Sequence, residues 1–304
     1  MGSKINQKTY SSKILLFGEY TILHGSKAVA IPYNNYFGSW KYKASYNDRD
    51  SLHPIKQYLF SLYQTNQMNN FDFDKLEYQL TKGLYFDSNI PQGYGIGSSG
   101  ALTAAIFDRF VVHKQQCKFT DLKAMLALIE SFFHGSSSGL DPLISYLNQP
   151  ILIHNDKKIE FLDFENKIIN NQLFLLDTGI DRSTSPLVKA YLETRKSSEI
   201  FIMKMQLISE INDLIIDNYL SQDIENLEKY IQQLSQLQYE TLKMLIPPHF
   251  YDLWENGITT KSYSLKLNGA GGGGFLMLFL HNTSISIANI CKKYNIAKYQ
   301  KITT

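Results

Sequence analysis

The stretch Pro91-Gln-Gly-Tyr-Gly-Ile-Gly-Ser-Ser-Gly100 decides how the rest of the chain is interpreted. Its first three glycines can adopt positive φ, and without a Cβ they let a ligand approach the backbone. Its two serines are good N-cap residues, and the apolar run that follows, 101–107, has helical spacing. At such a helix start, unpaired amides and the positive end of the helix dipole favour an anion such as phosphate. A flexible turn with an ordinary cap is an equally good interpretation, because glycine-rich motifs also occur by chance.

Two well-known nucleotide-binding motifs do not match this stretch. A P-loop requires Gly-Lys-Ser/Thr, which does not follow, and a dinucleotide fingerprint requires a short buried strand and a tight turn before it. The histidines have no metal-ligand spacing, and we interpret His24 and His134 as structural residues.

The composition is that of a chain with a sizeable core. Its 304 residues suffice for one large domain or two moderate ones, and a hydrophobic fraction of 44% excludes global disorder. The net charge of +2, with scattered acids and bases, argues against a nucleic-acid surface. Cys117 and Cys291 cannot form a disulfide framework and match no zinc site. Because no signal peptide and no run of ~18 apolar residues is found, we expect a cytoplasmic protein without membrane contact.

Apolar periodicity predicts a mixed α/β first part and a helix-rich second part, with a change of composition near residue 180. Strands are expected at 13–18, 28–31, 36–46, 76–86, 151–153, 173–176, 262–267 and 275–280. Helices are expected at 53–63, 98–113, 121–133, 285–294 and over most of 187–246, where a break near 221–223 separates at least two long helices. A further short helix contains Trp254 and is closed by Gly257.

Four polar features need an explanation. Lys13 stands at the mouth of a buried strand, where a solvated lysine is the simplest interpretation. Glu130, near the end of an apolar helix, opposes the helix dipole and should have a cation or metal as partner, unless it is exposed. Asp141 precedes Pro142, as an N-cap residue would, which does not exclude a catalytic role. The run Gly269–Gly274 costs entropy on ordering and is tolerable only where the backbone closely approaches a ligand or the first glycine loop.

Together these residues resemble the GHMP kinase superfamily, whose three signature motifs occur here in the expected order. The motifs are residues 13–25, Pro91 to Gly100, and Lys266-Leu-Asn-Gly-Ala-Gly-Gly-Gly-Gly274. Within the superfamily, the segment from Glu130 to Asp141 is similar to the Glu…His-Gly-x-x-Ser-Gly-x-Asp segment of mevalonate kinases, and 177–184 is similar to their substrate loop. The resemblance implies ATP-dependent, Mg²⁺-assisted phosphorylation of the primary C5 hydroxyl of mevalonate, a step of isoprenoid biosynthesis.

The resemblance also implies roles for individual residues. The phosphates of ATP would lie against Gly93, Gly95, Gly97, Ser98, Ser99 and Gly100. Ser99 and Glu130 would hold Mg²⁺ through hard oxygen ligands. Asp141 would accept the proton of the attacking hydroxyl, and Lys13 would keep Asp141 ionised and favour the forming alkoxide. The substrate contacts would be Glu19, Tyr20, Arg182 and Thr184, with Arg182 facing a carboxylate.

Two residues depart from the pattern of mevalonate kinases. Tyr20 stands where those enzymes usually have histidine, which leaves the substrate open but not the phosphoryl transfer. Gly100 replaces the usual alanine after Ser-Ser, and we expect this change to be mild.

The fold that the resemblance implies is α/β (α+β), in two parts. Residues 1–180 would form a ribosomal-protein-S5-domain-2-like half and residues 181–304 a ferredoxin-like half with added helices, with ATP and the alcohol between them. A homodimer is left open. Two other functions also stay open: a superfamily kinase acting on phosphomevalonate, homoserine or a sugar, and a non-catalytic ligand sensor on the same fold. The retention of Lys13 and Asp141 argues against the sensor.

Overall fold

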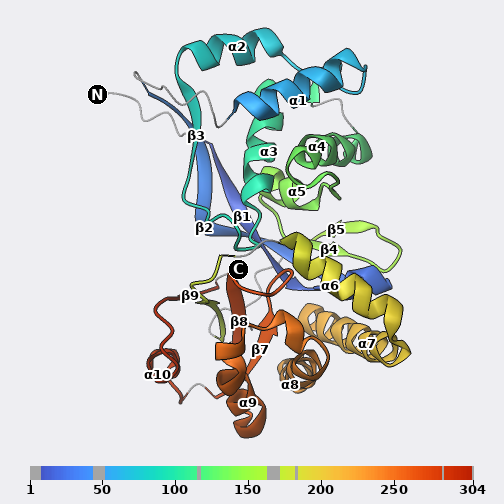
Figure 1. The fold of residues 1–304 in the computed structure, drawn as a ribbon, viewed down its shortest axis with the longest axis vertical. Helices are drawn as coiled ribbons and strands as arrows, with labels where there is room; N and C mark the ends of the chain where they lie inside the picture. Colours follow the sequence, from blue (N-terminus) through green and yellow to red (C-terminus); the bar gives the residue numbers. More distant parts are fainter. Residues whose placement is uncertain are drawn as a thin grey trace. The chain divides into compact units, whose positions relative to one another are not determined.

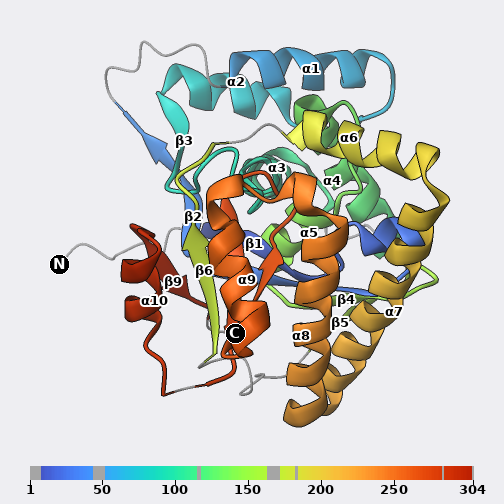
Figure 2. The ribbon, with the colours of Figure 1, turned by 60° about the horizontal axis from the view of Figure 1, so that its bottom comes forward.

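A computed structural model describes residues 8–43, 52–114, 118–162, 172–181, 184–282 and 284–302 (Figures 1 and 2). The chain forms two compact units, and each combines segments that are distant in the sequence. Unit 1 comprises Met1–Lys13, Pro32–Ile90 and Gly97–Gln149, and unit 2 comprises Ile14–Ile31, Pro91–Ile96 and Pro150–Thr304. The domain boundary at residue 180 stays a prediction.

Unit 1 contains part of strands β1 (Thr9–Phe17) and β2 (Ala28–Tyr42), each of which continues into unit 2. Its other elements are α1 (His53–Gln64), α2 (Phe73–Thr81), β3 (Leu84–Ser88), α3 (Ser98–Phe110), α4 (Phe119–His134) and α5 (Leu140–Leu147). Strand β3 pairs antiparallel with β2, so that Trp40 lies opposite Phe86. The Trp40 ring also contacts the ring of Phe110 edge-on, so aromatic side chains join β2 to the end of α3.

Helix α3 is the central helix of unit 1 and packs on α4 and α5 (Figure 1). Most of its residues are buried, and several of them are Gly or Ala, so that neighbouring helices can approach closely. A Cβ added to Gly100 would lie 2.9 Å from the Cβ of Asp141 on α5. The sequence therefore lets α5 pack directly against the first turn of α3.

Unit 2 is built on the antiparallel sheet β7-β8-β6-β9, of which β7 and β8 are buried along their whole length. Helices α8 and α9 pack on β7, and α7 packs on α8 (Figure 2). The elements of this unit, besides its share of β1 and β2, are η1 (Thr21–His24), β4 (Ile151–Ile153), β5 (Ile159–Phe161), β6 (Leu173–Asp177), α6 (Thr184–Ser197), α7 (Glu199–Ser221), α8 (Ile224–Thr241), η4 (Lys243–Leu245), η5 (Pro248–Phe250), α9 (Tyr251–Thr260), β7 (Tyr263–Leu267), β8 (Phe275–Leu280), α10 (Ile287–Lys293) and β9 (Tyr299–Lys301).

The predicted break near 221–223 is confirmed, and a second break separates α6 from α7. Both α7 and α8 begin at capping side chains: Ser198 accepts from the amide of Phe201, and Asp223 accepts from the amide of Asn226. The region 187–246 thus contains most of α6, the long helices α7 and α8, and the short helix η4, in agreement with the prediction of at least two long helices.

Three predicted elements were wrong in extent or type. The strands expected at 28–31 and 36–46 are one strand, β2, and residues 44–46 lie outside the described residues. The strand expected over 76–86 is helix α2 followed by β3, because Asp72 caps the helix through the amide of Lys75 and Gly83 turns the chain with a φ of 82°. In so short a segment, the same apolar residues fit the spacing of a strand and of a helix, so the pattern could not distinguish the two.

Gly257 does not end a helix but lies inside α9, which ends at Lys261 in the left-handed conformation. A Cβ at Gly257 would come within 2.8 Å of the Tyr263 ring. The glycine is therefore required by the close approach of strand β7 to helix α9 rather than by a helix end.

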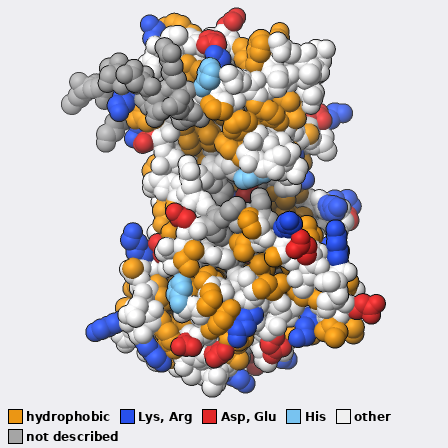
Figure 3. All heavy atoms as spheres, in the orientation of Figure 1, with side chains coloured by type: hydrophobic (Ala, Val, Ile, Leu, Met, Phe, Trp, Pro, Cys, Tyr) orange, Lys and Arg blue, Asp and Glu red, His pale blue; other side chains and the backbone are white. Residues whose placement is uncertain are grey.

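Among the described residues, no helix is both long and apolar enough to span a membrane. Acidic and basic side chains are interspersed on the face that Figure 3 shows, in agreement with the small net charge. Cys291 is buried, which raises the pKa of its thiol to about 11, and Cys117 lies outside the described residues.

Candidate active site

The two residues predicted to be catalytic, Lys13 and Asp141, lie together in unit 1. The Nζ atom of Lys13 is 3.1 Å from Oδ1 of Asp141, and their side chains are 11% and 36% exposed. Lys13 extends from β1, and Asp141 is the second residue of α5. An ammonium and a carboxylate that are separated by 128 residues in sequence, partly shielded from water, form the charge pair that a proton transfer could use.

Glycine residues make this arrangement possible. A Cβ at Gly97 would lie 2.9 Å from Cγ of Lys13 and 3.7 Å from Oδ2 of Asp141. Gly100 is equally close to the backbone and Cβ of Asp141. The glycine-rich stretch thus packs directly against the Lys13–Asp141 pair, which the sequence motif alone could not show.

Asp141 is not the N-cap of α5. That position is Gly139, with a φ of 73°, and the hydroxyl of Ser137 accepts a hydrogen bond of 2.9 Å from the Gly139 amide. The Ser/Gly loop therefore begins the helix, and the carboxylate of Asp141 is not used for capping. The competing interpretation of Asp141 as a simple cap is wrong, because the glycine in the left-handed conformation turns the chain two residues earlier.

Glu130 lies at the C-terminal end of α4 with only 4% of its surface exposed. Burial, together with the nearby charge of Asp141, raises the pKa of its carboxyl to about 7, although the hydrogen bonds from Ser137 and Ser99 and the charge of Lys13 oppose that shift. The hydroxyl of Ser137 donates to Oε2, and that of Ser99 lies 3.4 Å from Oε1. The interpretation of Glu130 as an exposed residue is thus wrong, and among the described residues the partners of its carboxylate oxygens are hydroxyls.

His134 belongs to this cluster, although sequence reasoning treated it as structural. Its Nε2 atom is 3.0 Å from the Ser99 hydroxyl. Glu130 and His134 are four residues apart on α4, so both side chains project from one face of the helix. This spacing was the available signal, and it became informative only once α3 was known to pack on that face.

The oxygens of Ser99 and Glu130 are suited to Mg²⁺, and they are too few for a metal ion that takes all its ligands from the protein. Among the described residues, no three His, Cys, Asp or Glu side chains are grouped as metal ligands. Mg²⁺ commonly binds one or two protein oxygens and completes its octahedron with water and phosphate oxygens. The buried Glu130 carboxylate, whose raised pKa reports a charge with little compensation, is the type of ligand that a divalent cation would stabilise.

The start of helix α3 differs from the prediction in one detail. The N-cap is Gly97, with a φ of 81°, rather than Ser98 or Ser99, which are the first two helical residues. No side chain among the described residues caps this helix start. Gly93 and Gly95 also have positive φ, of 76° and 73°, as the motif requires. The first amides of α3 are thus available to an anion.

In unit 2, two of the predicted substrate residues, Glu19 and Tyr20, form polar contacts with other residues of the protein. The Oε1 atom of Glu19 is 2.5 Å from Nζ of Lys266, and both side chains are buried. Burial lowers the pKa of Lys266, while the Glu19 carboxylate opposes that shift. The Tyr20 hydroxyl donates to the carbonyl of Ala270 at 2.9 Å, and the Tyr20 ring packs on Tyr191. Glu19 and Tyr20 thus tie the first motif to the third.

Arg182 lies outside the described residues, and Thr184 begins helix α6 with a side chain that is not described. The run Gly269–Gly274 has the close approach that was predicted. A Cβ at Gly274 would lie 2.8 Å from the backbone of Tyr94 in the first glycine loop, and one at Gly273 would lie 2.5 Å from the carbonyl of Ile180.

The class of protein follows from this fold and from comparison with known proteins. Residues 63–149 match the family model described as the GHMP kinases N terminal domain, and the chain has the mixed α/β fold of GHMP kinase structures. The resemblance to the GHMP kinase superfamily is thereby confirmed. The family supports a kinase that uses ATP on a small molecule.

The particular relatives include mevalonate kinases. The chain is 23% identical to the mevalonate kinase of Pyrococcus abyssi, over 92% of this chain and 90% of that one. Its fold is similar to that of L. major mevalonate kinase in complex with R-mevalonate, with a TM-score of 0.65, 15% identity and coverage of 98% and 95%. Lactococcus lactis galactokinase complexed with galactose is similar too, with a TM-score of 0.66, 12% identity and coverage of 100% and 95%.

Proposed function

We propose that this chain transfers the γ-phosphoryl group of ATP to the C5 hydroxyl of mevalonate. The observation that supports this most strongly is the contact of 3.1 Å between Lys13 and Asp141, directly against Gly97 at the start of α3. Phosphoryl transfer requires positioning and charge neutralisation more than covalent chemistry from the protein. A base and a cation beside an anion-binding helix start meet that requirement.

In the proposed mechanism, Asp141 accepts the proton of the attacking hydroxyl. A positioned base of this kind contributes roughly 10²–10⁴-fold in rate. The ammonium of Lys13 stabilises the charge on the Asp141 carboxylate and on the forming alkoxide. The glycine loop, Gly93, Gly95 and Gly97–Gly100, binds the phosphates through its amides.

Ser99 and Glu130 are the residues that would hold Mg²⁺. When bound, the ion neutralises charge on the phosphate oxygens of ATP. Glu130 then needs to be ionised, and Ser137 favours that state through its hydrogen bond. His134 orients the Ser99 hydroxyl, because its ring nitrogen contacts that group from the next turn of α4.

The substrate assignment rests on the relatives that are named mevalonate kinases, one of them solved with R-mevalonate. We propose Glu19, Tyr20, Arg182 and Thr184 as residues of the substrate pocket. Glu19 and Tyr20 would shape its wall, because their polar atoms already bind Lys266 and Ala270. Arg182 would face the mevalonate carboxylate. A cytoplasmic setting and a homodimer remain expectations.

A second candidate is a superfamily kinase for another small molecule. Tyr20 in the substrate motif favours it, and the similarity of the fold to that of a galactokinase complexed with galactose supports it. A phosphorylated acceptor such as phosphomevalonate would require additional Lys or Arg in the pocket.

The test is ADP release, coupled to an absorbance readout, with mevalonate, phosphomevalonate, homoserine and galactose as acceptors. We expect turnover with mevalonate only. Asp141→Asn should lose roughly 10²–10⁴-fold in kcat and still bind ATP. Asp121→Asn is the matched control, because Asp121 also lies in the first turn of a helix, α4, whereas the ion pair of Lys13 is with Asp141.

Turnover with a different acceptor would refute the substrate assignment alone. Undiminished turnover of Asp141→Asn would remove Asp141 as the base. ATP binding without phosphoryl transfer to any of the four acceptors would favour the sensor and refute the kinase.

A further inference from the structure

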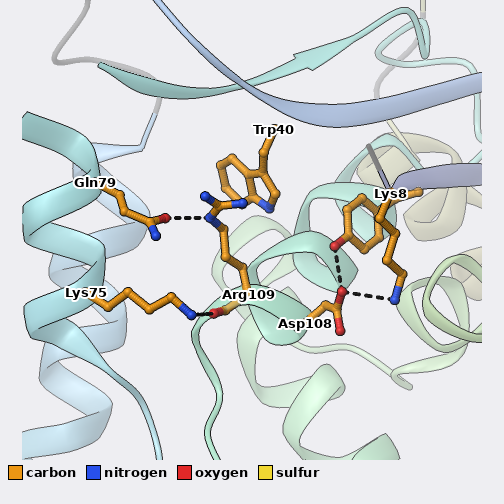
Figure 4. A pocket seen from close by; sticks show the side chains of 7 residues that line it. Lys8, Trp40, Lys75, Gln79, Asp108 and Arg109 are labelled. Carbon is orange, nitrogen blue, oxygen red and sulfur yellow. Dashed lines mark hydrogen bonds and ion pairs between the residues drawn. The ribbon is translucent and has the colours of Figure 1, made fainter. Parts of the chain in front are cut away.

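A basic cavity lies in unit 1, at the opposite end of α3 from the glycine loop (Figure 4). Its volume is about 370 Å³, within the range of small-molecule sites. Ser99 and Arg109 are ten residues apart on α3, which places the two ends ~15 Å apart along the helix axis. The cavity lining consists of Lys8, Tyr10, Trp40, Lys75, Gln79, Asp108 and Arg109.

The guanidinium of Arg109 is fixed by neutral partners. Its Nε donates to Oε1 of Gln79 at 2.5 Å, and its Nη2 donates to the hydroxyl of Tyr42 at 2.8 Å. The same group lies 5.8 Å from the centroid of the Trp40 ring. Figure 4 shows both side chains in the cavity lining. No acidic side chain among the described residues forms an ion pair with Arg109. The guanidinium is therefore held in one orientation with its charge uncompensated by a carboxylate.

Lys75 adds a second charge of the same kind. It lies four residues before Gln79 on α2, and its Nζ donates to the carbonyl of Arg109 at 2.8 Å. That bond satisfies a carbonyl at the end of α3 and uses one of the three N–H groups of the ammonium. The bond to the end of α3 explains why a lysine is present at this position. The other two N–H donors of the Lys75 ammonium remain for another group.

The one carboxylate in the cavity lining, that of Asp108, is already saturated. It accepts from Lys114 at 2.7 Å and from Tyr10 at 2.8 Å, and it pairs with Lys8 at 2.9 Å. The lining thus contains three cations, Lys8, Lys75 and Arg109, and one carboxylate, and the partial negative charge at the end of α3, roughly half a unit, does not balance them. The cavity keeps an excess of positive charge.

We propose that this cavity binds a phosphate or diphosphate group, at a site separate from the transfer site. Arg109 would contact two oxygens of the anion through its fork, and Lys75 and Lys8, both exposed at the rim, would close over it. The source of the group is either an inorganic diphosphate or the diphosphate of a nucleotide. The proposal does not depend on the identity of the phosphoryl acceptor.

The chain supplies its own probe, because it has two tryptophans. Trp40 lines the cavity, whereas Trp254 is fully buried in unit 2. We would label the full chain with 5-fluorotryptophan, assign the Trp40 resonance with Trp40→Phe, and titrate pyrophosphate and ADP in separate ¹⁹F NMR experiments. The expected result is a saturable shift of the Trp40 resonance with a constant Trp254 resonance. A response to pyrophosphate alone identifies a bare diphosphate, and a response to ADP identifies a nucleotide.

Lys75→Gln should weaken binding about tenfold, since it removes one charge-assisted contact. Lys8→Gln, at a side chain that is 52% exposed, is a second variant that preserves the fold. Lys82→Gln is the matched control, because Lys82 ends the same helix and does not line the cavity. Equal affinities of the Lys75→Gln and Lys82→Gln variants, or no shift of the Trp40 resonance, would overturn the proposal. So would loss of the Trp40 shift in Ser99→Ala, because the effect would then originate at the glycine loop.

Discussion

Substitution of Gly100 by alanine tests how the active-site geometry is built. The resemblance of the sequence to mevalonate kinases predicts a mild effect of alanine at this position. The structure predicts a larger one, because a Cβ at this position would lie 2.9 Å from both C and Cβ of Asp141 and 3.0 Å from the nitrogen of Pro142. Carbon atoms in contact need about 3.5 Å, so α5 would move by roughly 0.5 Å.

Two opposing terms decide the stability of Gly100→Ala. Alanine in a helix is favoured over glycine by about 1 kcal/mol, whereas overpacking against a backbone costs about 1–3 kcal/mol. We therefore expect a net loss of about 0–2 kcal/mol. The effect on catalysis should be clearer, because the displaced atoms belong to Asp141, which lies 3.1 Å from Lys13. A misplacement of 1 Å can cost about 10²-fold, so about 0.5 Å should cost roughly tenfold in kcat.

The assay is ADP release at saturating ATP and acceptor, together with urea unfolding. Gly257→Ala is the matched control: Gly257 is also inside a helix, and a Cβ there would lie 2.8 Å from Tyr263, but in unit 2. This variant should lose similar stability and keep its kcat. If Gly100→Ala loses no more turnover than Gly257→Ala, the close packing of α3 on Asp141 does not position the proposed base.

Three further predictions concern unit 2. Burial lowers the pKa of His281 to about 4, whereas the unfolded chain protonates near its ordinary value of 6.5. The unfolded state then binds more protons, so stability should fall by up to about 3 kcal/mol as the pH drops from about 6.5 to about 4, and His281→Gln should flatten that dependence in urea unfolding at several pH values. Lys266→Met should cost about 3–5 kcal/mol, because it removes the ammonium that pairs with the buried Glu19 carboxylate. Adding Glu19→Gln should restore most of the loss, and an additive double variant would contradict this. Tyr20→Phe should lose about 1 kcal/mol with the hydrogen bond to Ala270, and an unchanged urea midpoint would show that this bond contributes nothing.

Sequence reasoning found the candidate catalytic residues because their signals are local. Lys13, Ser99 and Asp141 each stand in a short motif, and Glu130 is conspicuous as an acid at the end of an apolar helix. The same reasoning missed contacts between distant segments. Nothing local relates Glu19 to Lys266, which are 247 residues apart, and their ion pair is visible only in the folded chain.

Local ambiguity explains the errors in the fold. Residues 76–86 contain apolar side chains at spacings that suit a strand and a helix alike, and the cap at Asp72 selects the helix. Glycine is typical of a helix end, which is why Gly257 was expected to close its helix. Instead it lies inside α9, where it lets the helix pack closely on β7.

By itself, the sequence determined the resemblance to the GHMP kinase superfamily, the mixed α/β class and the chemical types available at the site, because these depend on residue identity and short-range spacing. Only the tertiary structure decided that Lys13 meets Asp141, that α3 leaves no room for a side chain at Gly100, and that Glu130 is buried with a raised pKa. Distances between groups remote in sequence, and the water around them, are consequences of packing, which no single segment encodes.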